Sequence, residues 1–427
     1  MSVQPLSPSA RLAVLAAAVG GLLFDGVELG LMPVASLSVS QSLLGESYTP
    51  TLGGDWFARF TAALMLGAAV GGIALGNLGD VIGRTRALGI SVLFYSIFAG
   101  MGAYVQTQEQ MLGLRFLVGL GVGGVWPNAV ALAAECWPDK SRPIVAGLMG
   151  TALNGGILML SQIARYWHIT PDSWRWIFQL AAVPAVLGIL VLAFLPESPL
   201  WLASQLRKKS SQGGENMAGK NVHKGVLIEL FRPPLLRLTL IGILLGSVPM
   251  VGAWAASKWM IPWADKVGGS AAAGYKAATQ GWWALGAVLG SFFGAQIAAW
   301  LGRRRAYAII SAGATLFTLL MFMGTAPLKA SFHPIVFGQG FVATLFFGWL
   351  PLYLPELFPT RVRAAGSGIA YNIGRFATAL GVLVAGALFA AMGGSYPRVG
   401  ATCGLIYLLG LIVIWWAPDT TKTKLED

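Results

Sequence analysis

The sequence predicts an all-α membrane protein in which twelve transmembrane helices form two pseudo-symmetric bundles of six. Three observations support this fold class. The 427 residues are 56% hydrophobic and only 11% charged, whereas a soluble domain is about a quarter charged. Twelve apolar runs follow one another, each near the roughly 20 residues that a bilayer-spanning helix needs. The second six runs also repeat features of the first six. A soluble multidomain enzyme and a disordered chain are therefore excluded.

The apolar runs form two groups of six on either side of a polar gap. They lie at about 11–34, 57–79, 86–106, 110–135, 143–166 and 174–196, and then at about 234–262, 277–300, 305–325, 331–355, 364–388 and 397–417. An open sheet would leave backbone groups unpaired in lipid, and no alternating pattern indicates a barrel, so we expect helices. The first run is too long for a signal peptide, and no small-residue cleavage site follows it.

The polar gap divides the chain into three predicted units. These are an N-terminal bundle (1–202), a linker rich in Lys, Ser, Gly and Gln (203–233), and a C-terminal bundle (234–427). Such a composition is typical of a flexible connection between two folded units.

The 29 Lys and Arg against 17 Asp and Glu give a net charge of +12. In a soluble protein this excess would suggest a nucleic-acid partner, but here most of the bases lie in one set of loops. The positive-inside rule assigns those loops, the linker and both termini to the cytoplasm. We therefore expect a multi-pass protein of the bacterial inner membrane that works as a monomer in the lipid bilayer, with no nucleic-acid partner.

Few residues are suited to metal or enzyme chemistry. Cys136 and Cys403 lie far apart, and the three histidines fit no metal-ligand spacing. No nucleophile–base pair or phosphate loop is apparent either. We predict no metal, no cofactor beyond a coupling proton, and no enzymatic activity.

An internal repeat relates the two groups of spans. Gly119, Glu135, Pro138 and Arg142 recur 221 residues later as Gly340, Glu356, Pro359 and Arg363. The segment 76–84 matches 295–303 more weakly, at an offset of 219. Two homologous halves in parallel, joined by a linker, are the architecture of an alternating-access carrier.

The motifs themselves resemble a known family. Segment 76–84 (GNLGDVIGR) resembles the loop 2–3 signature of the major facilitator superfamily, and 115–123 (RFLVGLGVG) resembles its fourth-helix motif. Segments 174–176, 196–202 and 356–361 are similar to the sugar-porter and organic-ion branch. The resemblance covers essentially the whole chain and implies the major facilitator fold.

Within that branch, segment 24–28 (FDGVE) is similar to the first-helix pattern of aromatic-acid and sialate/lactate proton symporters, with Glu28 in place of the usual second Asp. The paired glutamines of sugar porters are absent from 241–263. The proline of drug/proton antiporters is absent from 147–156. Symport of an acid is therefore favoured over sugar uptake or drug efflux.

Asp25 and Glu28 are the predicted proton-coupling residues. They are three residues apart, hence on one helix face, and Asp25 lies roughly 20 Å into its span, near the midplane. Two neighbouring carboxylates in a poor dielectric cannot both ionise readily, so one should hold a proton near neutral pH. The resemblance implies that Arg115 lies beside the helix-one carboxylate and takes part in coupling. The competing interpretation is that one carboxylate only pairs with Arg115 and locks helices one and four together.

Arg375 is the main clue to the substrate. It lies roughly 16 Å into the eleventh span, and its guanidinium must be offset by an anion because it cannot lose its proton. Spans eight, nine, eleven and twelve contain no acidic residue. Either a substrate carboxylate offsets the charge, as the resemblance to organic-anion carriers implies, or Asp25 or Glu28 pairs with it across the halves.

Further residues are predicted to stack on or hydrogen-bond to a substrate, although each could serve packing alone. They are Trp126, Asn128, Asn154, Trp254, Gln280, Trp349, Tyr371 and Asn372. Lys258 is expected near the outer end of span seven, with its amine extending to the headgroups.

A last group is predicted to act in gating. Gly76 and Gly83 should allow helices two and eleven to approach and the chain to turn tightly. Asp80 should accept backbone N–H groups at the start of helix three or pair with a neighbouring arginine. Glu135 with Arg142, and Glu356 with Arg363, should form equivalent charge networks. The full set is Gly76, Asp80, Gly83, Arg84, Glu135, Arg142, Arg303, Glu356 and Arg363.

The leading hypothesis is therefore proton-coupled symport of a small organic anion, a mono- or aromatic carboxylate, by alternating access. Two alternatives remain open. One is a sugar or organic-cation carrier of the same fold, with Arg375 bridging to Asp25. The other is a transporter-like receptor that does not transport.

Overall fold

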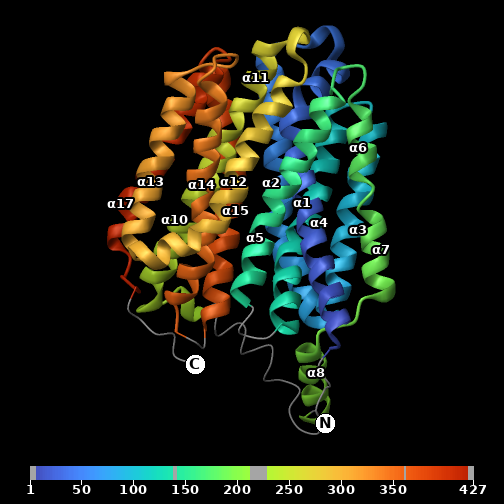
Figure 1. Cartoon of the computed structure of the whole chain (residues 1–427), viewed down its shortest axis with the longest axis vertical. Coiled ribbons are helices and arrows are strands. Elements are labelled where there is room, and N and C mark those ends of the chain that lie inside the picture. The colour runs from blue at the N-terminus through green and yellow to red at the C-terminus, as the bar shows by residue number, and fades with distance from the viewer. Residues whose placement is uncertain (1–5, 138–141, 212–227, 360–361, 422–427) are drawn as a thin grey trace.

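The computed structural model describes residues 6–137, 142–211, 228–359 and 362–421. These parts of the chain are helical and contain no strand. The helices run side by side as two groups, coloured blue to green and yellow to red in Figure 1. The predicted all-α membrane fold is confirmed.

The first half contains six spans. They are α1 (Pro8–Leu44), α2 (Pro50–Ile82), α3 (Arg84–Met101), α4 (Gln108–Cys136), α5 (Arg142–Tyr166), and a sixth made of α6 (Arg175–Ala181) and α7 (Ala185–Phe194). Thr49 and Thr107 cap two of these helices, because their hydroxyls accept the amide protons of Leu52 and Gln110.

The second half repeats this order. Its spans are α10 (Leu235–Val251) with α11 (Met260–Gly268), α12 (Tyr275–Leu301), α13 (Arg303–Leu319), α14 (Phe332–Glu356), α15 (Arg363–Ala391), and α16 (Tyr396–Gly404) with α17 (Ile406–Val413). A π-helical turn, η4 (Gly252–Ala256), and a short 3-10 turn, η5 (Ser257–Trp259), connect α10 to α11.

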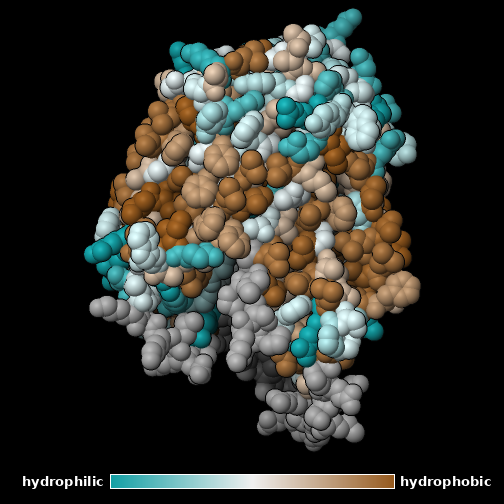
Figure 2. Space-filling model, in the orientation of Figure 1, coloured by the Kyte–Doolittle hydropathy of each residue, from teal (hydrophilic) through white to brown (hydrophobic). Residues whose placement is uncertain are grey.

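Eleven of the described helical segments are long and apolar enough to cross a membrane. The one predicted span not among these eleven is the fifth, at about 143–166, which corresponds to α5, a helix of 25 residues. Large apolar side chains cover the outside of the bundle, where Figure 2 shows a broad hydrophobic belt between more polar ends. This surface is what a protein surrounded by lipid requires.

The repeat extends to the packing of the helices. A Cβ atom at Gly71 of α2 would lie 2.0 Å from the carbonyl oxygen of Leu120 in α4. One at Gly290 of α12 would lie 2.2 Å from that of Phe341 in α14. These pairs occupy equivalent positions in the two halves, and only glycine permits the backbones to come so close.

The predicted linker begins as a helix. The helix α8 (Pro199–Ser211) follows the sixth span and continues nine residues into the segment 203–233; residues 212–227 lie outside the described chain. We call the end of the molecule that carries α8 the α8 end, and the opposite one the α11 end (Figure 1). The two halves meet where α2 packs against α15 and α5 against α12.

Candidate functional site

A central cavity of about 390 Å³ lies between the halves. Its wall comes from α1, α2, α4 and α5 of the first half and from α10, η4, η5, α12, α14 and α15 of the second. A volume of this size suits a small organic molecule. Among the described residues, three charged side chains line it: Asp25, Lys258 and Arg375.

Asp25 is the acidic residue in this lining. It is 2% exposed, and its Oδ1 has no hydrogen-bond partner in the described structure. No basic side chain of the described residues lies within 4.0 Å of its carboxylate. A buried carboxylate without a cation is costly when ionised, so the site favours a protonated Asp25 or a bound compensating group.

Glu28 and Arg115 form a buried ion pair between α1 and α4, with both side chains 1% exposed. Neither residue lines the cavity. The family resemblance implied that Arg115 lies beside a helix-one carboxylate, and this carboxylate is that of Glu28. Asp25, about one turn earlier in α1, lines the cavity instead. The pair has the geometry of a lock between two helices of the same half.

Arg375 reaches from α15 across to the first half. Its Nη1 donates to the carbonyl oxygen of Ala68 in α2 at 3.0 Å, and its guanidinium lies 5.3 Å from the ring centroid of Tyr371. A Cβ at Gly72 would lie 2.8 Å from Nη1, so this glycine makes room for the arginine. No described carboxylate lies within 4.0 Å of the guanidinium, so neither Asp25 nor Glu28 forms a direct ion pair with it in this conformation.

Lys258 is a cavity residue that the sequence argument missed. The prediction ended its span at 262, but the helix continues to Gly268, so the lysine is 1% exposed rather than extended to the headgroups. Its Nζ lies 3.5 Å from the ring centroid of Trp283 and 5.5 Å from that of Trp254. The apolar residues beyond 262 and the unusually long run were the signal that could have located it.

Most of the predicted aromatic and amide residues also line the cavity. The predicted residues in the lining are Trp126, Asn154, Trp254, Tyr371 and Asn372. Asn154 of α5 donates to the hydroxyl of Ser291 in α12 at 2.7 Å and so links the halves at the cavity wall.

Three predicted substrate-binding residues lie elsewhere. Trp349 packs on Tyr307 and donates to the carbonyl of Arg303. Asn128 donates to two carbonyls within its own half, and Gln280 donates to the carbonyl of Gly30 and a neighbouring hydroxyl. None of the three lines the cavity. Their N–H groups bond to neighbouring helices, although the amide oxygens of Asn128 and Gln280 have no partner in the described structure.

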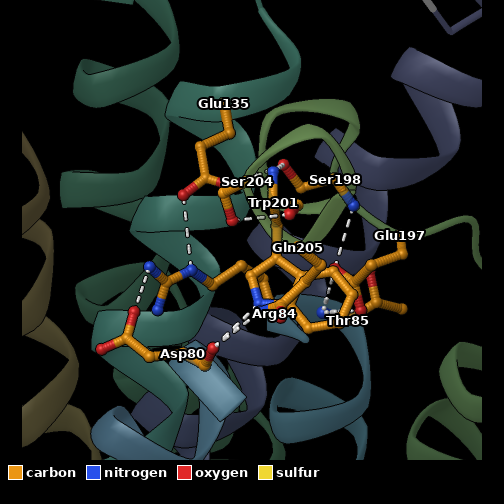
Figure 3. Close-up of polar contacts among 9 residues, drawn as sticks. All are labelled: Asp80, Arg84, Thr85, Glu135, Glu197, Ser198, Trp201, Ser204 and Gln205. Carbon is orange, nitrogen blue, oxygen red and sulfur yellow. Dashed lines mark hydrogen bonds and ion pairs between the residues drawn. The ribbon is translucent and has the colours of Figure 1, made fainter. Parts of the chain in front are cut away.

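A polar network joins the helices of the first half at the α8 end (Figure 3). Arg84 binds Asp80 of α2 at 2.5 Å and Glu135 of α4 at 3.3 Å. The carboxylate of Glu197, not that of Asp80, accepts the amide proton of Thr85 and so caps the start of α3. Gly83 makes the predicted tight turn with φ of 112°.

The second half contains the equivalent network. Arg303 makes two hydrogen bonds to Glu356, at 2.8 and 3.0 Å, and Thr420 donates to the same carboxylate. The glutamates therefore pair with Arg84 and Arg303 in these networks. Of the expected partners, the side chain of Arg142 is outside the description, and Arg363 donates to the carbonyl of Phe358.

One prediction about the gating residues is wrong. Gly76 does not face helix eleven; a Cβ there would first meet Pro127 of α4 at 3.4 Å. Gly72, one turn earlier, is the glycine that faces α15. Both described networks connect elements of a single half.

The cavity is closed at the α11 end. Trp259 stacks on Phe389 with centroids 4.9 Å apart and meets the ring of Phe57 from α2 edge-on at 5.1 Å. Lys276 of α12 donates to the hydroxyl of Ser38 in α1 and pairs with Asp265, each at 3.0 Å. The contacts of Trp259 with Phe57 and of Lys276 with Ser38 join the two halves.

The cavity extends toward the α8 end. The lining reaches Val130, Pro355 and Ser367, close to the ends of α4 and α14 and the start of α15. A site between two halves that is sealed on one side defines an integral, multi-pass membrane transporter.

Comparison with known proteins agrees with this class. The family model of the Major Facilitator Superfamily matches residues 17–381, and the chain belongs to this family. It is 29% identical over 393 residues to the cis,cis-muconate transport protein of Acinetobacter baylyi, covering 91% of this chain and 89% of the relative. It is 26% identical to a probable 4-methylmuconolactone transporter of Cupriavidus pinatubonensis, covering 86% and 82%.

A solved structure also has the same fold. The xylose transporter XylE from E. coli, in a partially occluded inward-open conformation, superimposes with a TM-score of 0.73. The match covers 98% of this chain and 100% of that one at 18% identity.

Proposed function

We propose that the protein is a proton-coupled symporter of a small organic anion. The observation that carries this proposal is the charge of the cavity, where Lys258 and Arg375 face a single described acid, Asp25. An anionic substrate would offset the excess positive charge, and a guanidinium can bind a carboxylate through two parallel hydrogen bonds. The relatives named for muconate and methylmuconolactone transport support an organic anion as the cargo.

The same charges supply a physical reason for coupling. When Asp25 takes up a proton, the cavity gains positive charge and binds an anion more tightly. By linkage, a bound anion favours protonation of Asp25 to the same extent. Proton and anion would then cross together as the halves rock.

The orientation of the protein follows from its loops. The positive-inside rule assigns the α8 end and both termini to the cytoplasm, so the cavity would face inward here. We propose a monomer in the bacterial inner membrane, with the proton as coupling ion and no other cofactor.

Transport into proteoliposomes tests the proposal. With radiolabelled carboxylates, the wild type should accumulate acid when a pH gradient is imposed and should not do so in control liposomes without a gradient. Asp25→Asn should retain counterflow but lose accumulation, while Asp172→Asn, which alters an exposed acid, should behave as wild type. Gradient-independent transport by the wild type would refute proton coupling, and full coupling in Asp25→Asn would refute the role of Asp25 in it.

A ligand panel separates the alternatives. A carrier of sugars or organic cations would be stabilised thermally by those compounds and not by acids. A receptor that does not transport would bind acids but show no counterflow. Arg375→Ala should abolish stabilisation by acids if the guanidinium binds them.

A further inference from the structure

We infer that Lys258 is a second anion anchor and that, together with Arg375, it makes the cavity selective for dicarboxylates over monocarboxylates. The inference rests on the proposed function, because it assigns a second contact to the same cargo. Its basis is an independent feature of the cavity: a buried lysine that lacks an acidic partner.

The ammonium group of Lys258 is buried against two tryptophan rings but lacks a hydrogen-bond acceptor. It is 1% exposed, and its Nζ has no hydrogen-bond acceptor in the described structure. The faces of Trp283 and Trp254 attract the cation but supply no lone pair for its three N–H donors. Asp265, the nearest acid in sequence, is already paired with Lys276 at 3.0 Å.

The two cations lie at different depths in the bundle. Gly374 of α15 packs between Gly246 and Met250 of α10, since its built Cβ lies 3.4 Å from the backbone of Gly246 and 3.1 Å from the methionine sulfur, and Arg375 follows directly. Lys258 comes eight residues after Met250 toward the α11 end. That separation corresponds to on the order of 10 Å along the axis at the usual helical rise.

A cargo with a carboxylate at each end fits this separation. An extended six-carbon dicarboxylate holds its terminal carbons roughly 6 Å apart, given carbon–carbon bonds of about 1.5 Å. The flexible stems of lysine and arginine cover the remaining distance. The apolar and aromatic lining of the same cavity, including Trp126 and Trp254, suits the hydrocarbon middle of such a molecule.

The charges balance for this cargo. With Asp25 protonated, Lys258 and Arg375 contribute two positive charges, which a dianion neutralises. A monocarboxylate leaves one buried cation without an anion, and an uncompensated buried charge weakens binding. The second carboxylate should therefore strengthen binding by roughly 10- to 100-fold, the effect of one charge-assisted hydrogen-bonded contact.

Adipate and hexanoate, which share a six-carbon chain and differ by one carboxylate, test the inference. Their dissociation constants are measured by titration calorimetry on the purified full-length protein at neutral pH. The variants are Lys258→Gln, Lys258→Arg and, as a matched control, Lys266→Gln, which removes an exposed lysine from the same span. Thermal unfolding of each variant checks that it is folded.

We expect wild type and Lys266→Gln to bind adipate roughly 10-fold or more tightly than hexanoate. Lys258→Gln should lose this ratio, and Lys258→Arg should restore it. A wild type that binds the two acids equally, or a folded Lys258→Gln that keeps the ratio, overturns the inference and leaves the proposed function standing. A wild type that binds neither acid, nor any other carboxylate, overturns both.

Discussion

Replacing Glu28 with methionine should lower the free energy of unfolding by about 3–5 kcal/mol, because it leaves the guanidinium of Arg115 buried without its anion. Both side chains of this pair are 1% exposed. Arg115→Leu should cost a similar amount by stranding the carboxylate. The double variant should lose much less than the sum, since an apolar pair of similar volume carries no desolvated charge.

The exposed pair between Arg59 and Asp55 is the matched control. Its side chains are 48% and 26% exposed, so the same three variants there should change stability by less than about 1 kcal/mol. Unfolding of the purified protein by SDS titration measures both double-mutant cycles. Additive losses in the Glu28 and Arg115 cycle would show that the two charges do not stabilise each other.

A second readout separates a lock from a proton site. If the pair is structural, Glu28→Gln should lose stability but retain pH-driven accumulation per folded molecule. A variant that is as stable as wild type but uncoupled would instead assign the proton to Glu28.

Four further substitutions test the closure of the cavity at the α11 end and the turn at Gly83. Gly54→Leu should collide with the ring of Phe389, which lies 2.1 Å from a Cβ built there, and so increase labelling of a cavity cysteine from the α11 side. Lys276→Gln removes a link between the halves and should increase the same labelling to a smaller extent. Gly83→Ala should lower stability by about 1–2 kcal/mol or more because φ is positive there. In the same thermal assay Gly76→Ala should be nearly neutral, since the nearest atom lies at 3.4 Å.

The fold could be predicted from the sequence because its signals are local. Run length identifies spans, and the offsets between Gly119 and Gly340, or Glu135 and Glu356, reveal the repeat. The structure confirms the all-α membrane fold. It adds that the repeat reaches single contacts, since Arg84 with Glu135 recurs as Arg303 with Glu356.

The site was only partly predictable. Asp25 and Arg375 stand out because a charge inside an apolar run is rare and costly. Lys258 did not, because its span runs six residues past the predicted end and passes through the π turn η4. A π turn changes the angular position of every later side chain, so helical spacing alone could not show that this lysine faces the cavity.

The sequence by itself therefore determined the class of protein, the spans and the few charges placed within them. Hydropathy and charge are properties of individual residues, so they can be read from the sequence without knowledge of the packing. Only the tertiary structure decided that Asp25 faces the cavity while Glu28 pairs with Arg115, and that Gly72 rather than Gly76 meets α15. Those outcomes depend on how each helix is rotated about its axis, which the packing of its neighbours sets.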